Sequence, residues 1–437
     1  MLSRIIKIIA AAVLSAAVLC GCEYIGNDTD ALLSPPRPAG ELYNIQQTLK
    51  NSVTEKYTLK YPTGGDYRSA IIQKDLNSDG VEEAVAFYST VKDGAVSMHI
   101  MLIEKERNNW VSRGDFKCVA TGVEAVDFCD MDADGVMEIL VGWTVYGNIE
   151  KMLGVYTVDG GEFMQRISES YNNFLCCDFY DNGKQEIFLL NMNSKDNTSV
   201  AKLMALSDQG TDLLGTVELD STVTAYSEPI VSKLPNGNTG VYVDAIKGAG
   251  VITEVLEITP TGMINALLNE NNQIADTFRS SAASVRDIDG DGIMEIPINI
   301  LITQADDSSE NIYRTEWCVV KNKALEVKLS ALMNYGDGYF IVIPEKWKGK
   351  VTVTRDTANR TRTIMRIDSA TGNSAEMLVK VQVLAAGEAS APTPEDAGTF
   401  ELGSAGELRY VASLGLYAGE EAVTSAEFKQ LFKILGN

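Results

Sequence analysis

Apolar and polar residues alternate with a period of two across residues 67–333, in short runs separated by turn residues. Alternation over runs of this length is typical of antiparallel strands that bury one face. The first four runs cover residues 70–72, 84–88, 96–103 and 110–118. Four short strands in succession are the content of one antiparallel sheet, and the stretch that follows repeats the pattern.

A helical spacing precedes the first strand. The apolar residues that recur every three or four positions are Leu42, Ile45, Leu49 and Val53. This spacing predicts a helix of about three turns, beginning at Glu41, whose apolar side packs against the body of the protein.

An acidic pattern, D-x-[DN]-x-D-G-x-x-E, occurs three times, starting at Asp75, Asp130 and Asp287. Side chains at positions 1, 3 and 5 can surround one hard cation, with the carbonyl of position 7 and the carboxylate of position 9 completing an all-oxygen ligand set. The predicted Ca²⁺ ligands are Asp75, Asn77, Asp79, Val81 and Glu83; Asp130, Asp132, Asp134, Val136 and Glu138; and Asp287, Asp289, Asp291, Ile293 and Glu295. We expect up to three structural Ca²⁺ sites; the alternative is ordinary turns, which the same residue types also form.

The spacing of these loops indicates further units. A degraded copy starts at Asp178, with Tyr180 at position 3 and Asn182 at position 5, and a vestige without acids lies around Asn236. The loop starts at Asp75, Asp130 and Asp178 are 55 and 48 residues apart, and a period near 50 then accommodates five units. We therefore predict a mainly β protein, a propeller-like array of about five four-stranded antiparallel blades. The alternative is an irregular antiparallel sandwich with repeated hairpins.

The acidic hairpins resemble FG-GAP or VCBS-type repeats of integrin-like propellers, and the resemblance covers about residues 67–333. It implies a Ca²⁺-binding hairpin within each blade, with side-chain ligands at positions 1, 3, 5 and 9. The chain departs from that family in carrying Glu at position 9, where Asp is frequent, and in lacking the FG-GAP tripeptide itself.

The repeats end near Asn334, and residues 335–437 are predicted to form a small α+β domain. Its expected strands cover residues 351–354, 363–367 and 377–383, and a final helix with Phe428, Phe432 and Leu435 on its apolar side follows. Thr424 or Ser425 is expected to cap that helix. The stretch around Trp347 faintly resembles the opening of PsbP-like domains, from which no function is carried over.

The N-terminus predicts the compartment. Residues 1–21 combine a basic start with a short apolar segment, as a secretory signal does. The ending Leu19-Cys20-Gly21-Cys22 resembles the bacterial lipobox, which implies lipidation of Cys22 and an anchor on the extracytoplasmic side of the cell membrane. The alternative is an ordinary cleaved signal. Residues 22–40, which contain three prolines, suit an extended tether, so that residues 41–334 hold the helix and the propeller.

Charge and residue usage exclude several kinds of chemistry. The formal net charge of -23 argues against nucleic acid as a partner, because no basic patch exists to meet phosphates. The single histidine, His99, is expected to be a strand residue with a satisfied ring, which leaves triad and His-rich metal catalysis without support. Five cysteines follow Cys22, and they fit no zinc spacing: Cys118, Cys129, Cys176, Cys177 and Cys318. They are expected to be free, although Cys118 and Cys129 can pair if their strands are neighbours.

These features predict a non-enzymatic, membrane-anchored lipoprotein whose Ca²⁺-stabilised propeller binds a protein or a glycan at the cell envelope. Two alternatives remain. One is a glycoside hydrolase or lyase that uses paired carboxylates on the propeller face, since such chemistry needs only two acids across a cleft. The other is a purely architectural component of the envelope.

Overall fold

The computed structural model describes residues 40–145, 151–160, 162–193, 195–207, 210–281, 283–302, 312–368, 370–371, 374–385, 387–388 and 398–436. The predicted signal, nearly all of the tether and Cys22 lie outside these ranges. Strands dominate the described residues, and no helix among them is long and apolar enough to cross a membrane.

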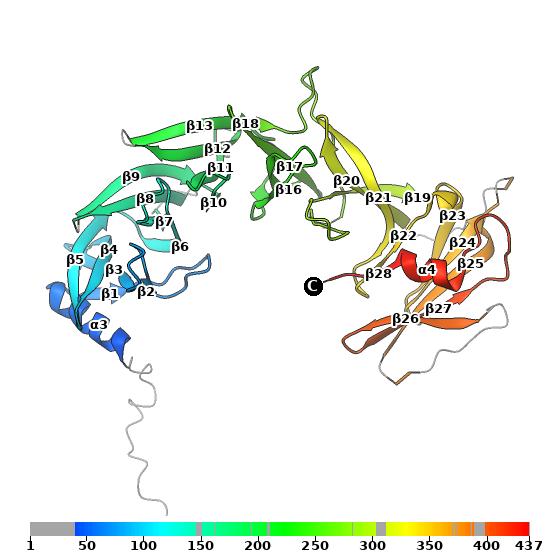
Figure 1. Ribbon diagram of the computed structural model, residues 1–437, viewed down its shortest axis with the longest axis horizontal. Helices are drawn as coiled ribbons and strands as arrows, with labels where there is room; N and C mark the ends of the chain where they lie inside the picture. Colours follow the sequence, from blue (N-terminus) through cyan, green and yellow to red (C-terminus); the bar gives the residue numbers. More distant parts are fainter. Residues whose placement is uncertain are drawn as a thin grey trace, which may run out of the picture.

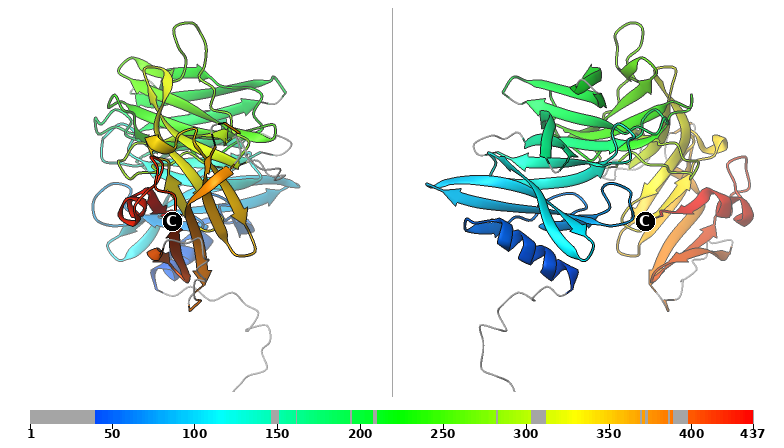
Figure 2. Two further views of the ribbon diagram at one scale, coloured as in Figure 1. Left: turned by 90° about the vertical axis from the view of Figure 1, so that its right-hand side faces the viewer. Right: turned by 60° about the vertical axis from the view of Figure 1, so that its left-hand side comes forward.

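Five antiparallel sheets follow one another along an open arc, and we number them as blades one to five in chain order (Figure 1). In blades one to three the first strand lies on the inner side of the arc and the last strand on the outer side (Figures 1 and 2). This arrangement confirms the predicted propeller-like array of about five blades.

Blade one carries the predicted helix. The helix α3, Glu41–Ser52, buries Ile45 and Leu49 completely against one face of the sheet. The strands of blade one are β1 (Tyr57–Leu59), β2 (Ile71–Lys74), β3 (Glu83–Lys92), β4 (Ala95–Glu106) and β5 (Asn109–Cys118). β1 and β2 pair in succession with the same edge of β3, so they act as one interrupted first strand.

Blades two and three each contain four strands that pair in chain order, and blade four contains five, two of which pair with the same central strand. Blade two contains β6 (Gly122–Cys129), β7 (Glu138–Thr144), β8 (Lys151–Asp159) and β9 (Glu162–Tyr171). Blade three contains β10 (Asn173–Cys177), β11 (Glu186–Asn193), β12 (Thr198–Ser207) and β13 (Gly210–Glu218). Blade four contains β14 (Ala225–Tyr226), β15 (Ile230–Lys233), β16 (Thr239–Lys247), β17 (Gly250–Thr259) and β18 (Gly262–Asn265). Apolar side chains on facing sheets join each blade to the next.

Blade five extends beyond the predicted domain boundary at residue 335. Its strands are β19 (Ile296–Ile302), β20 (Ile312–Lys321), β21 (Ala324–Asn334), β22 (Tyr339–Val342) and β28 (Phe432–Ile434). The boundary falls in the tight turn between β21 and β22, so β22 continues the same sheet. The prediction that the final helix includes Phe432 and Leu435 was wrong, because the helix ends at Leu431 and Phe432 begins β28, where it pairs with Ile341.

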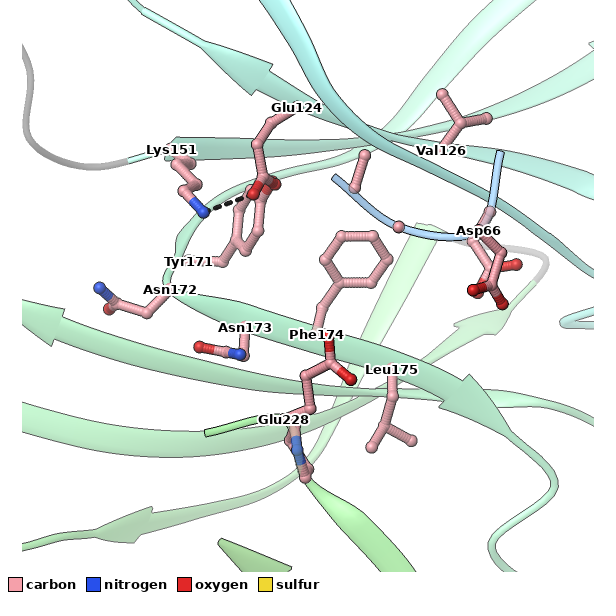
Figure 3. A pocket seen from close by; sticks show the side chains of 14 residues that line it. Asp66, Glu124, Val126, Lys151, Tyr171, Asn172, Asn173, Phe174, Leu175 and Glu228 are labelled. Atoms are coloured by element: carbon pink, nitrogen blue, oxygen red, sulfur yellow. Dashed lines mark hydrogen bonds and ion pairs between the residues drawn. The ribbon is translucent and has the colours of Figure 1, made fainter. Parts of the chain in front are cut away.

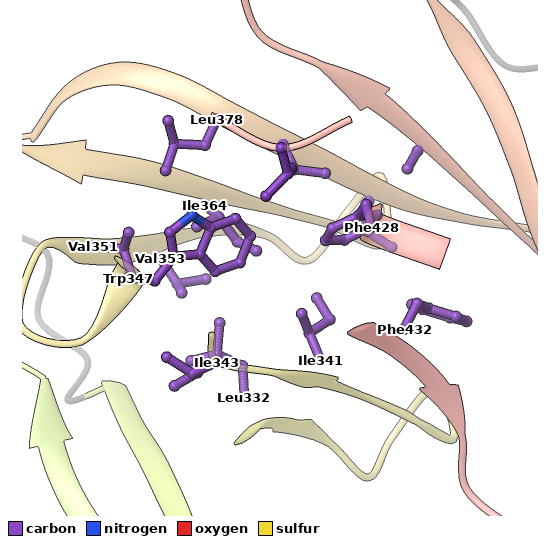
Figure 4. Close-up of a cluster of buried hydrophobic side chains, with 14 of the residues drawn as sticks. Leu332, Ile341, Ile343, Trp347, Val351, Val353, Ile364, Leu378, Phe428 and Phe432 are labelled. Carbon is purple, nitrogen blue, oxygen red and sulfur yellow. The ribbon is translucent and has the colours of Figure 1, made fainter. Parts of the chain in front are cut away.

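The remaining C-terminal residues form a sixth sheet with one helix. Its strands are β23 (Val351–Asp356), β24 (Thr361–Ile367), β25 (Ser374–Ala385), β26 (Thr399–Ala405) and β27 (Leu408–Leu414). The helix α4, Ser425–Leu431, is capped by Thr424, whose hydroxyl accepts the backbone N–H of Glu427. The short 3₁₀ helix η1, Glu345–Trp347, places the Trp347 indole in the core between this sheet and blade five, where it is fully buried (Figure 4).

A disulfide joins blades two and three. Cys129, at the end of β6, is bonded to Cys176 in β10, whereas Cys118, Cys177 and Cys318 are free. The expectation of free cysteines was therefore wrong for this pair, as was the alternative pairing of Cys118 with Cys129. The bond links the first strands of two successive blades, a neighbour relation that only the arc creates.

Candidate functional site

The acidic loops share one backbone conformation. In each of the four loops that begin at Asp75, Asp130, Asp178 and Asp287, the carboxylate of position 1 accepts the backbone N–H groups of positions 5 and 6. The glycine at position 6 has φ between 85° and 88° in these loops and at Gly237, a conformation that glycine adopts without steric cost. The degraded loop at Asp178 thus keeps the fold of the intact ones.

The glutamate at position 9 closes each hairpin from the inside. Its carboxylate accepts the backbone N–H of position 2 at 2.9 Å in the first loop, 2.8 Å in the second, 3.1 Å in the Asp178 loop and 2.9 Å in the Asp287 loop. The four glutamates are all buried: Glu83, Glu138, Glu186 and Glu295. This structural role explains why the degraded loop retains Glu186 after losing acids at positions 3 and 5.

The loop at Asp130 has the donor set of a cation site. One oxygen from each of Asp130, Asp132 and Glu138 lies within 4.8 Å of the other two. Ca²⁺ binds oxygens at 2.3–2.6 Å, so oxygens at this separation fit around one ion. Burial, followed by the nearby aspartates, raises the pKa of Glu138 to about 7, and a cation in the loop would favour its ionised form.

The other two intact loops differ in their surroundings. In the loop at Asp75 the Asn77 amide oxygen accepts the backbone N–H of Asp79, as Asp132 accepts that of Asp134 in the second loop, so position 3 offers a neutral oxygen here. In the loop at Asp287 one oxygen from each of four acids converges within 4.8 Å: Asp287, Asp289, Asp291 and Glu295. The ammonium of Lys328 already contacts three of these acids, at 2.9 Å, 2.6 Å and 2.7 Å.

Position 7 is oriented in the same way in all three intact loops. The backbone N–H of this residue donates to the aspartate at position 5, at distances of 2.8 Å, 2.7 Å and 3.0 Å. The residues concerned are Val81, Val136 and Ile293. The vestigial loop around Asn236 lacks carboxylates at the corresponding positions, and its amides instead bind Glu257 of β17.

Neighbouring loops also contact one another. The N–H of Met137 donates to the Leu76 carbonyl at 2.6 Å, and the Ser78 hydroxyl donates to the Gly135 carbonyl at 3.0 Å. The N–H of Gln185 donates to the Asp130 carbonyl at 3.2 Å. These contacts join the loops of blades one, two and three into one row, so that the conformation of one loop supports the next.

A separate cleft of about 280 Å³ lies on the inner side of the arc, where blades two, three and four meet (Figure 3). Its walls combine aromatic, amide and charged side chains, and the ring of Phe174 points into the opening. The polar and aromatic residues that line it are Asp66, Glu124, Asp127, Lys151, Tyr171, Asn172, Asn173, Phe174 and Glu228. No sequence motif marks these residues, since they come from separate strands and connections.

One wall of the cleft is an ordered polar group. Glu124 accepts a hydrogen bond from the Lys151 ammonium at 2.6 Å and another from the Tyr171 hydroxyl at 2.6 Å (Figure 3). Burial and the Glu124 carboxylate raise the pKa of Tyr171, which keeps its hydroxyl protonated as a donor. The group is therefore a fixed pattern of donors and acceptors.

The opposite wall carries two neighbouring acids. Burial, with a contribution from the Asp66 carboxylate, raises the pKa of Asp127 above its ordinary value. Asp66 lies in the connection between β1 and β2 of blade one, where the N–H of Gly64 donates to the Glu124 carbonyl at 2.5 Å. The Arg68 side chain binds the carbonyls of Thr63 and Gly65 and so holds the turn that presents Asp66.

His99 belongs to a hydrogen-bonded row that resembles a catalytic triad in its order. Thr90 Oγ1 lies 3.0 Å from His99 Nε2, and His99 Nδ1 lies 3.0 Å from Asp115 Oδ2. Thr90 is only 3% exposed, so its hydroxyl is closed to a substrate. The expectation of a strand histidine with a satisfied ring is confirmed, and the row acts as a polar tie across β3, β4 and β5.

No protein-family model and no curated protein matches the chain. A rhamnogalacturonan lyase of Bacillus licheniformis aligns with a TM-score of 0.30 at 11% identity, covering 70% of each chain. The Dos1 propeller aligns with a TM-score of 0.29 at 12% identity, covering 78% of this chain and 81% of that one. An exo-β-1,3-galactanase of Phanerochaete chrysosporium aligns with a TM-score of 0.25 at 10% identity, covering 82% and 95%. Likenesses of this size carry no argument about substrate or activity.

Proposed function

We propose that the protein is a lipid-anchored lipoprotein on the extracytoplasmic side of the cell membrane. Its propeller is a non-enzymatic module that binds a glycan of the cell envelope in the inner cleft. In this proposal the acidic loops bind Ca²⁺ to stiffen the blades, as the FG-GAP/VCBS resemblance implies, and take no part in ligand binding.

The composition of the cleft is the observation that carries this proposal. Sugar rings present apolar C–H faces and a rim of hydroxyls, so their sites combine an aromatic surface with amide and carboxylate partners. The cleft offers the Phe174 ring beside Asn172 and Asn173, and Glu124 and Glu228 add acceptors for hydroxyl groups. The acidic loops are built differently, since in the hairpins at Asp130 and Asp287 the acids converge on one point.

The disulfide supports the extracytoplasmic location. A bond such as Cys129–Cys176 forms and persists in oxidising compartments, and it is rare where thioredoxin and glutathione keep thiols reduced. This agrees with the signal and lipobox pattern of residues 1–22.

Binding to envelope glycans tests the proposal. The full chain is titrated with purified oligosaccharides from the envelope, and Phe174→Ala is compared with Tyr43→Ala, which removes an exposed aromatic ring from α3. We expect Phe174→Ala to weaken binding at least tenfold and Tyr43→Ala to leave it unchanged. Equal binding by both variants, or no glycan binding with capture of a protein partner instead, contradicts the cleft as a glycan site and favours the protein-binding or architectural alternative.

A second candidate, a glycan-active enzyme, is favoured by the acid pair Asp127 and Asp66. A buried carboxyl with a raised pKa beside a second carboxyl is the arrangement of a proton donor and its partner in glycoside cleavage. Release of reducing ends or of unsaturated products from the bound glycan tests this candidate. Activity that Asp127→Asn abolishes supports it, and binding without turnover refutes it.

A further inference from the structure

The acidic loops differ in whether a side chain from a neighbouring strand enters their centre. A β-bulge on that strand determines which side chain is available. In blades one, two and three the fourth strand contains one extra residue, opposite the third-strand residues that pair with the start of the second strand. In blade five the strand β21 contains the equivalent extra residue, opposite the β20 residues that pair with the start of β19. The extra residue is Arg113 in β5, Arg166 in β9, Leu214 in β13 and Lys328 in β21. A bulge redirects the side chain it carries, so these four residues occupy equivalent positions.

In blade five the bulge directs Lys328 at the loop. Its ammonium lies 2.7 Å from Glu295 Oε1, 2.6 Å from Asp291 Oδ2 and 2.9 Å from Asp289 Oδ2. Glu295 is fully buried, and its other oxygen already accepts the N–H of Ile288. The ammonium therefore takes the carboxylate oxygen that the loop would otherwise offer to a metal ion.

In blades one and two the bulge residues turn away from their loops. Arg113 binds Glu104 and Glu106 on the neighbouring strand β4. Arg166 donates to the Ser207 carbonyl in blade three at 2.9 Å. The side-chain partners of both arginines among the described residues thus lie outside the acidic loops, which leaves the loops at Asp75 and Asp130 to an external cation.

Blade three presents the intermediate case. Leu214, the bulge residue, lines one hollow together with Tyr180, Asn182 and Glu186 of the degraded loop. An apolar side chain at this position accompanies the loss of the acids at positions 3 and 5. The bulge residue is thus apolar in blade three, where the loop has lost two acids, and positively charged in blade five, where the loop keeps its acids.

We infer that Lys328 is a built-in counter-ion that replaces Ca²⁺ in the loop at Asp287, so that the chain binds two Ca²⁺ ions and not three. This inference rests on the proposed role of the loops as cation clamps. A Ca²⁺ ion can enter the Asp287 loop only after the ammonium leaves, and the ammonium, being tethered, returns at a high effective concentration. The hairpin at Asp287 is therefore held together without a metal ion. It belongs to blade five, on which the C-terminal sheet packs.

Counting bound ions tests the inference. Equilibrium dialysis with Ca²⁺ at fixed pH and ionic strength is performed on the full chain, on Lys328→Met and on Lys328→Gln. The matched control is Lys321→Met, which removes an exposed lysine of β20 that pairs with Glu326 outside the loop. We expect two ions for the wild type and the control and three for both Lys328 variants, with the third ion lost again when Asp287→Asn is added to Lys328→Met.

Each outcome is decisive. Three ions in the wild type, or no gain in either folded Lys328 variant, overturns the inference. No ion in the wild type and one in the Lys328 variants supports Lys328 as the counter-ion while removing Ca²⁺ from the loops at Asp75 and Asp130. Glycan binding is measured separately and is independent of this count, so failure of the proposed ligand site is distinguished from failure of the counter-ion.

Discussion

Removal of the disulfide between blades two and three should destabilise the protein by an amount set by the length of chain it closes. Cys129 and Cys176 are 47 residues apart in sequence. The loop-closure entropy of a bridge over that length corresponds to about 4 kcal/mol at 25 °C. The double variant Cys129→Ala/Cys176→Ala should lose about this much free energy of unfolding, because its unfolded chain regains the freedom of the loop.

Urea denaturation, followed by far-ultraviolet circular dichroism and tryptophan fluorescence, measures the loss. A reductant should lower the midpoint of the wild type to that of the double variant and leave the double variant unchanged. Cys118→Ala is the control, because Cys118 is a free thiol that packs beside the core of blades one and two. A loss below about 1 kcal/mol would refute the view that the bond limits the unfolded chain.

Three further changes probe other parts of the fold. Arg279→Met should cost about 3–5 kcal/mol in urea denaturation, because it leaves the Asp244 carboxylate buried without its 2.6 Å ion pair; a loss below 1 kcal/mol contradicts this. Glu186→Ala should cost about 1–3 kcal/mol and speed amide exchange at Phe179, whose N–H loses its acceptor, whereas Glu186→Gln should retain most of the stability. Burial raises the pKa of Glu254 in the folded state, so the penalty for its charge applies at neutral pH and is relieved as the pH falls through that pKa. Glu254→Gln should therefore raise stability at pH 7 and reduce the gain on acidification, and an unchanged pH profile contradicts the assignment.

The local pattern was sufficient to predict the repeats. Period-two alternation placed strands where they occur, and the recurrence of Asp and Gly at fixed spacing gave the number of blades, including the vestigial one around Asn236. These features depend on residues near one another in sequence, so turn chemistry and burial on one face determine them. The apolar spacing from Glu41 likewise predicted α3 with its observed start.

Features that join distant segments could not be predicted from the same pattern. The pairing of Cys129 with Cys176 depends on which first strands become neighbours, and the contact of Lys328 with Asp289 depends on a bulge across the sheet. The cleft gathers Asp66, Glu124 and Glu228 from three different blades or connections. Phe432 fitted the apolar side of a continuing helix, but pairing with β22 outweighed local propensity.

Thermal unfolding of the full chain with Ca²⁺ and with a chelator tests the central claim, that the acidic loops are cation clamps, most directly. At a Ca²⁺ concentration of about 100 times Kd each occupied site adds about 2.7 kcal/mol to stability. We predict a higher Tm in Ca²⁺ than in chelator for the wild type, and loss of that difference in Asp75→Ala/Asp130→Ala. The same Tm in both conditions, or an undiminished Ca²⁺ response in the double variant, would contradict the account.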